Sequence, residues 1–149
     1  MKEDKIDAGP MEEPLISFLR PSEIVSYQIP QGSVLVGDNH IVRGAVCVIG
    51  GAPGVGKSRA AVALAQAGAT GEPWFGHEVH RRFKTMILQN ENGRHRLKLE
   101  VSDISANLEE WVRISPPPPY GLCFNNAEFR DQLGFYIREF KPDVVIIDP

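Results

Sequence analysis

The sequence predicts an α/β fold in which a mostly parallel sheet is flanked by helices. Three observations support this prediction. A glycine-rich loop, residues 50–58, joins an apolar run to an alanine-rich run, which is the order strand, loop, helix. Two further apolar runs, 85–88 and 143–148, lack the alternation of a half-exposed strand and are typical of parallel strands buried on both faces. Residues 125–140 have helical periodicity, so strands and helices alternate along the chain.

The first 32 residues are predicted to be an N-terminal segment that precedes the domain. Residues 1–14 are acidic and contain one glycine and two prolines, which is typical of a disordered lead-in. Residues 15–30 mix apolar residues with prolines, which predicts a short helix or strand that wraps the domain. The domain itself is predicted to span residues 33–149.

Two short strands and one buried strand are predicted ahead of the glycine-rich loop. Residues 33–36 and 41–44 flank a turn at Gly37-Asp38-Asn39. Residues 45–49 are entirely apolar and are expected to form a core strand that buries Cys47.

Residues 51–58 match the phosphate-binding loop pattern G-x-x-x-x-G-K-[ST], between the expected strand and helix. The glycines let successive N–H groups face one concavity at a helix N-terminus, where the helix dipole also favours an anion. Lys57 is expected to reach the β- and γ-phosphates of ATP or GTP, and the Ser58 hydroxyl to hold Mg²⁺. The alternative is a glycine-rich turn that binds nothing. The candidate nucleotide-binding residues are Gly51, Ala52, Pro53, Gly54, Val55, Gly56, Lys57, Ser58 and Arg59.

The helix that follows the loop is predicted to end near Gly71, with Pro73 just beyond it. In the next loop His77 and His80 are three residues apart and have no third ligand nearby. Surface histidines are therefore favoured over a metal site.

Glu91 follows the buried strand 85–88, within the polar turn 89–93. In a parallel sheet, ligands bind beyond the carboxyl ends of the strands, so Glu91 is expected on the same rim as the phosphate-binding loop. This makes Glu91, together with Lys57, a catalytic candidate, as the general base for the water that attacks the γ-phosphate. A solvated acid in a turn is the alternative. The cations in residues 94–98 are expected to form a solvated helix face rather than to contact phosphate or nucleic acid.

A strand at 110–115 is predicted to run into a stiff loop of four prolines, 116–119. The next helix is expected to begin with Asn125 as its N-cap. The Glu128 side chain is expected to accept a hydrogen bond from the backbone N–H of Asn125. Its apolar face is predicted to contain Phe129, Leu133, Ile137 and Phe140.

The run 143–148 places Asp148 at the carboxyl end of an apolar strand. This is the form of a Walker B strand, whose acid holds Mg²⁺ directly or through water. Many buried strands end in aspartate, so the pattern alone also fits a structural acid. Paired with residues 51–58, it favours a magnesium site made by Ser58 and Asp148.

Composition limits the other possibilities. A net charge of −3 gives no overall attraction to nucleic acid, although a local basic patch stays open. Cys47 and Cys123 have neither metal-ligand spacing nor the pattern of a disulfide framework, which fits a reducing cytoplasm. No apolar run approaches the length of a membrane span. The expected location is cytoplasmic.

Several segments together resemble the RecA-like AAA-type ATPases of the RepA hexameric helicase group. They are residues 35–44, 51–58, 69–76, 88–91 and 143–148. The resemblance extends from about residue 33 to the last residue. It implies a RecA-type P-loop NTPase sheet, ATP with Mg²⁺ as cofactor, and Glu91 at the family's catalytic glutamate position. It also implies a homo-oligomeric ring that acts on single- or double-stranded DNA in replication or repair.

In that family, a strand that follows Walker B inserts between the loop strand and the Walker B strand, and later elements carry a polar sensor residue and an arginine finger. Residues 1–149 end before such elements. The expectation is therefore a fold that is incomplete at its C-terminus, and poor stability of the 149-residue chain.

Three functions follow as hypotheses. The leading one is Mg-dependent ATP hydrolysis coupled to DNA. A nucleotide-gated regulatory module with slow hydrolysis and a P-loop small-molecule kinase are the alternatives.

Overall fold

The computed structural model describes residues 16–102 and 108–149, in a chain that divides into two units, Met1–Pro30 and Gln31–Pro149. In the first unit, helix α1 (Pro21–Ser26) starts with a proline, and the Arg20 N–H donates to Glu23 Oε2 at 2.6 Å. A short helix was one of the two predicted forms of this segment. Whether it wraps the domain stays a prediction, and the expected lead-in 1–14 lies outside the described residues.

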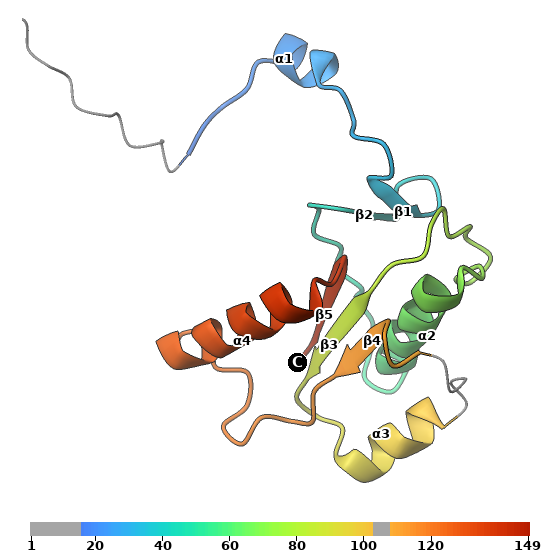
Figure 1. Ribbon diagram of the computed structural model, residues 1–149, viewed down its shortest axis with the longest axis vertical. Helices are drawn as coiled ribbons and strands as arrows, with labels where there is room; N and C mark the ends of the chain where they lie inside the picture. The colour runs from blue at the N-terminus through green and yellow to red at the C-terminus, as the bar shows by residue number, and fades with distance from the viewer. Residues whose placement is uncertain (1–15, 103–107) are drawn as a thin grey trace, which may run out of the picture. The chain divides into compact units, whose positions relative to one another are not determined.

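A three-stranded parallel sheet lies at the centre of the second unit (Figure 1). Its strands are β3 (Thr85–Gln89), β4 (Val112–Ile114) and β5 (Val144–Asp148), in the order β4-β3-β5. In the ladder Ile87 lies opposite both Ile114 and Ile146, and Gln89 opposite Asp148. Every residue of β3 is buried. The predicted parallel α/β architecture is confirmed.

Helix α2 (Lys57–Thr70) packs on one face of this sheet, where Val62 and Ala65 join Ile87 in a buried cluster. Alanine and glycine on the contact side allow this close approach. A Cβ on Gly68 would lie 2.3 Å from the buried ring of Phe83. The helix ends as predicted, since Gly71 takes the left-handed conformation that closes a helix (φ 84°).

Strands β1 (Val34–Val36) and β2 (Ile41–Val42) form an antiparallel pair. The pair turns at the predicted Gly37-Asp38-Asn39, where Gly37 and Asn39 have positive φ. Leu35 and Ile41 contribute to a second buried cluster, which also contains Leu64 of α2 and Phe83. These contacts pack the hairpin against α2.

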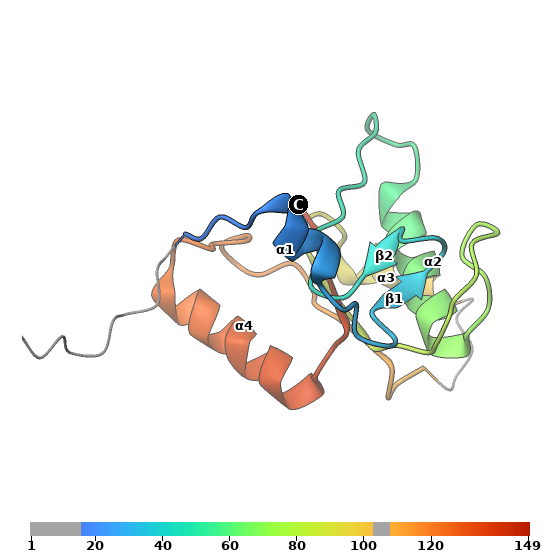
Figure 2. The same ribbon diagram turned by 90° about the horizontal axis from the view of Figure 1, so that it is seen from above.

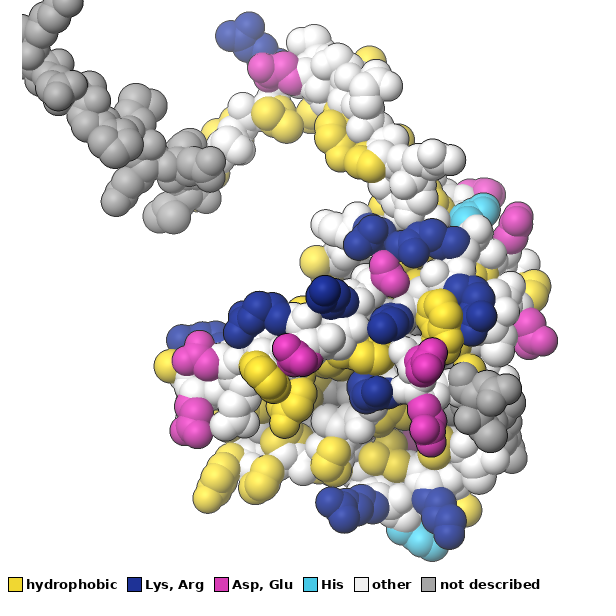
Figure 3. Space-filling model, viewed as in Figure 1, with side chains coloured by type: hydrophobic (Ala, Val, Ile, Leu, Met, Phe, Trp, Pro, Cys, Tyr) yellow, Lys and Arg dark blue, Asp and Glu magenta, His cyan; other side chains and the backbone are white. Residues whose placement is uncertain are grey.

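Helix α4 (Ala127–Phe140) lies on the other side of β5 from α2 (Figure 2). Its N-cap is Asn126 and not the predicted Asn125, because Asn126 has the extended backbone and its side chain accepts the Phe129 N–H at 3.3 Å. Glu128 instead accepts a hydrogen bond from Gln132. Hydrophobic side chains are exposed over α4 and the loop before it, Tyr120 and Tyr136 among them (Figure 3). The predicted apolar face is half-buried: Phe129, Leu133, Ile137 and Phe140.

The expected core strand 45–49 is wrong. Within the described residues no strand pairs with this run, and Val46 and Val48 are 92% and 85% exposed. Cys47 is exposed as well. Residues of this run and of β5 line a groove of about 630 Å³. Within the described residues, the run and β5 are not paired in a sheet. An apolar run forms a core strand only where neighbouring strands pair with it, and here no neighbour supplies the ladder.

Candidate functional site

A hollow of about 730 Å³ lies beyond the carboxyl ends of β3 and β5. We call it the rim hollow. Three separate parts of the chain meet there: the phosphate-binding loop with the start of α2, the turn after β3 with the helix that follows it, and the end of β5. Its size is in the usual range for small-molecule sites. Its lining residues are Pro53, Gly54, Val55, Gly56, Lys57, Ser58, Arg59, Glu91, Asn92, Arg96, Asp148 and Pro149.

The start of α2 gives the rim hollow its anion-binding character. Gly56, the N-cap, has φ 96° and Gly54 has φ 80°, a left-handed backbone that residues with a Cβ adopt only under strain. No side chain caps the helix. The N–H groups of its first turn have no partner within the helix, and the residues that carry them line the hollow. An uncapped N-terminus of this kind favours a bound anion.

The Lys57 ammonium bridges the phosphate-binding loop. Its Nζ donates to the carbonyl oxygens of Gly51 at 3.1 Å and Ala52 at 3.2 Å. Gly51 and Ala52 are not among the described residues that line the hollow. Their carbonyl oxygens bind the side chain of Lys57, which does line it. A phosphate oxygen carries negative charge, so it would bind the ammonium more strongly than these neutral carbonyl oxygens do. Lys57 is therefore held within the loop but is able to change partner.

Ser58 is in the first turn of α2, and Asp148 is the last residue of β5. Both line the rim hollow. Ile146 packs against the α2 cluster, and Asp148, two residues later, lies on the same face of β5. A hydroxyl and a carboxylate are oxygen ligands of the kind that Mg²⁺ prefers. The rim hollow therefore contains two side chains of the chemical type that binds magnesium.

Glu91 lies in the turn between β3 and helix α3 (Arg94–Val101), and its side chain is exposed to the rim hollow. The turn is joined to β5 by a hydrogen bond from the Asn90 N–H to the Asp148 carbonyl oxygen at 3.1 Å. The structure thus brings Lys57, Ser58 and Asp148 together with Glu91. These are the four residues for which the sequence predicted chemistry.

The profile of the family described as AAA domain matches residues 14–149. The chain belongs to the AAA domain family. The match supports an AAA-type P-loop ATPase, and the parallel sheet flanked by helices is consistent with a RecA-like P-loop fold. No curated protein and no solved structure matches the chain.

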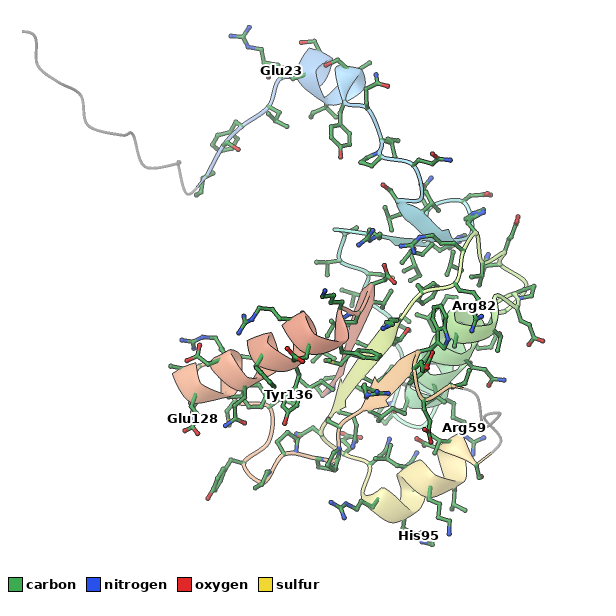
Figure 4. The ribbon with its side chains drawn as sticks, viewed as in Figure 1. Glu23, Arg59, Arg82, His95, Glu128 and Tyr136 are labelled. Carbon is green, nitrogen blue, oxygen red and sulfur yellow. The ribbon has the colours of Figure 1, made fainter. Side chains whose placement is uncertain are left out.

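Three residues that line the rim hollow of this AAA domain were not among the predicted site residues: Asn92, Arg96 and Pro149. Arg96 was assigned to a solvated helix face, and it lines the rim hollow while its Nε donates to Glu100 at 3.1 Å. Asn92 is a buried member of the turn. For a single basic residue on a polar helix, the sequence does not indicate which way the side chain points. Arg59 at the start of α2 and His95 on α3 lie at this same end of the AAA domain (Figure 4).

The histidines of the loop before β3 take part in local contacts. The ring of His77 lies 4.0 Å from the ring of His40, measured between centroids. His80 Nε2 is 2.9 Å from the carbonyl oxygen of Gly37. Both contacts join this loop to the turn between β1 and β2.

Within the described ranges, no helix of this AAA domain is both long and apolar enough to cross a bilayer.

Proposed function

We propose that this AAA domain binds ATP with Mg²⁺ and hydrolyses it. The observation that supports the proposal most directly is the composition of the rim hollow. One cavity contains an uncapped helix N-terminus, the Lys57 ammonium, two oxygen ligands for a cation, and the Glu91 carboxylate. Each of these groups suits a different part of a magnesium-bound triphosphate.

In this proposal the backbone N–H groups from Gly54 to Arg59 and the Lys57 ammonium bind the phosphates. Ser58 and Asp148 hold the magnesium ion, which neutralises charge on the β- and γ-phosphate oxygens. Glu91 orients the attacking water and accepts its proton. Arg96 supplies a further positive charge at the edge of the same cavity.

We further propose that hydrolysis is coupled to DNA and that the chain acts in a homo-oligomeric ring. The support is the sequence resemblance to the RepA hexameric helicase group. Helix α3 carries Arg94, Arg96 and Lys98 directly after the Glu91 turn, so cations and the proposed general base share one short segment. A polyanion that binds the cations of α3 would therefore influence the turn that carries Glu91.

Slow, regulatory hydrolysis is the second candidate. Glu91 and Arg96 are both exposed, so the rim hollow is open to water on the side of α3. An open site weakens electrostatic stabilisation of the transition state. A low basal rate that rises when a partner covers α3 would fit this geometry.

The test is a nucleotide titration followed by an assay of phosphate release. Fluorescent ATP and GTP analogues are titrated into the wild-type chain, Lys57→Ala, Glu91→Gln and the control Glu110→Gln, an exposed acid away from the rim hollow. We expect Lys57→Ala to weaken binding roughly 10- to 100-fold, because charge-assisted bonds are lost. Glu91→Gln should bind nucleotide normally and lose about 10²- to 10⁴-fold in hydrolysis.

The same assay with and without single-stranded DNA separates the candidates. Stimulation by DNA supports the motor, and a constant low rate supports the regulatory module. Phosphate found on an added small-molecule acceptor identifies a kinase instead. If the folded chain bound nucleotide equally well with and without the Lys57 ammonium, the proposal would be wrong.

A further inference from the structure

Gln89, the last residue of β3, is a buried polar side chain whose hydrogen-bonding capacity is almost fully used. It is 2% exposed. Its Nε2 donates to the carbonyl oxygens of Asn92 and Ser115, both at 2.9 Å, and its Oε1 accepts the Asn92 N–H at 2.7 Å. Burial of an amide is unfavourable unless such partners are present. The contacts therefore account for its presence in the core.

The partners of Gln89 require a primary amide. Two carbonyl oxygens need donors and one N–H needs an acceptor, all at a single buried position. A glutamate carboxylate has no donor, and a hydrocarbon side chain leaves all three backbone groups unpaired. Among side chains of this length, glutamine alone satisfies the set.

These bonds fix the turn that carries Glu91. Asn92 is held through both its N–H and its carbonyl oxygen by one side chain, which closes the turn. Ser115 ties the same side chain to the end of β4, while Asn90 is bonded to Asp148 on β5. Glu91 lies between two anchored neighbours. Gln89 itself is not among the described residues that line the rim hollow.

We infer that Gln89 is a positioning residue for hydrolysis: its amide holds the turn 90–92 so that the Glu91 carboxylate faces the phosphate-binding loop. The inference rests on the proposed function, since it assumes that Glu91 acts on the attacking water. Because Gln89 acts only through Glu91, its loss should lower kcat and leave nucleotide binding unchanged.

The test is a double-mutant cycle measured on the full 149-residue chain. Gln89→Met keeps the length of the side chain and removes its three hydrogen bonds. We expect kcat to fall on the order of 10²-fold, as displacement of a catalytic group by about 1 Å commonly does. The KM for ATP and the affinity for a fluorescent ATP analogue should change by less than about twofold. In the Glu91→Gln background, Gln89→Met should reduce kcat by less than about twofold further.

Two further variants separate positioning from loss of stability. Ile87→Val shortens a buried side chain on the same strand without touching the turn, and should keep wild-type kcat. Gln89→Glu should recover activity relative to wild type as the pH falls. The protonated carboxyl again offers one donor and one acceptor, and burial raises its pKa into an accessible range. It also serves as the test if Gln89→Met does not fold.

The outcomes distinguish the two proposals. If the wild-type chain releases no phosphate from ATP, the proposed function is wrong. If Glu91→Gln hydrolyses ATP as fast as wild type, the role of Glu91 is wrong, and the role of Gln89 fails with it. If Glu91→Gln is inactive but Gln89→Met keeps wild-type kcat, only the positioning role is overturned. A full additional loss in the double mutant would also overturn that role, since Gln89 would then act independently of Glu91.

Discussion

The Asn90 N–H donates to the carbonyl oxygen of Asp148 across 3.1 Å. This bond closes the parallel ladder between β3 and β5 at its last register pair, Gln89 with Asp148. Asp148 is the last residue of β5, and Glu91 lies two residues beyond the end of β3, so two acids far apart in the sequence lie at the same edge of the sheet. Both acids line the rim hollow.

Asp148→Asn should weaken the use of magnesium more than the binding of nucleotide. The amide keeps the shape of the side chain and removes the negative charge that a divalent cation requires. We expect the Mg²⁺ concentration for half-maximal phosphate release to rise about 10- to 100-fold. Asp38→Asn, at an exposed turn, is the control and should change nothing. An unchanged magnesium titration would exclude Asp148 as a metal ligand.

Asp143, just before β5, is expected to make stability depend on pH. Its carboxylate accepts hydrogen bonds from Arg81 Nη2 at 2.8 Å and from the Lys84 N–H at 3.1 Å, and lies 3.5 Å from Arg43 Nε. Burial acts to raise the pKa of Asp143, but these bonds and the charges of Arg81 and Arg43 outweigh it. They hold the pKa below its ordinary value of 3.8.

Because the folded-state pKa of Asp143 is lowered, its stabilisation is present above pH 3.8 and is lost as the pH falls through the folded-state pKa. Asp143→Asn should therefore cost about 1–2 kcal/mol in the free energy of unfolding at neutral pH. The difference from wild type should shrink in denaturant titrations below pH 3.8. Asp131→Asn, on the exposed face of α4, is the control. A difference that stays constant down to acid pH would contradict the assignment.

Gly68→Ala and Gly134→Ala should have opposite effects, although both glycines lie inside helices. A Cβ at Gly68 would meet the ring of Phe83, which is fully buried and has no room to move. We expect a loss of about 1–3 kcal/mol in thermal or denaturant unfolding. At Gly134 the nearest atom is the mobile end of Arg138, at 3.2 Å. Alanine there should stabilise by about 0.5–1 kcal/mol through helix propensity. Equal effects would show that α2 does not pack as closely as described.

Val48→Ala and Ile87→Ala test the exposed position of the run 45–49. Val48 is exposed and Ile87 is in the central strand. We expect a change within about 0.5 kcal/mol for Val48→Ala. For Ile87→Ala we expect a loss of about 2–5 kcal/mol. A cost at Val48 as large as that at Ile87 would mean that the run is a core strand of the folded chain after all.

The sequence predicted those features that depend on local patterns. The phosphate-binding loop is a short motif with its own turn geometry, and Gly71 marks the helix end for a reason confined to one residue. Asp148 was found because the strand that carries it is continuous and apolar. Its place beside the loop then follows from a general rule for parallel sheets.

The misses came from features that local patterns do not determine. Residues 45–49 have the composition of a core strand, but burial depends on partner strands that the run itself does not encode. Asn125 and Asn126 are identical as candidate caps, so the choice rests on backbone angles. Gln89 belongs to a polar turn in the sequence, and only its three partners distinguish it from a solvated residue.

The outer side of β5 has a consequence for the handling of the protein. In the sheet formed by the described residues, β5 is the terminal strand, and Val145 and Ile147 on it are exposed. A terminal strand with free backbone groups and apolar side chains is a template for edge-to-edge aggregation. Soluble yield of the 149-residue chain should fall as this chain is concentrated. A lysine at position 145 or 147 would act as a gatekeeper against that aggregation.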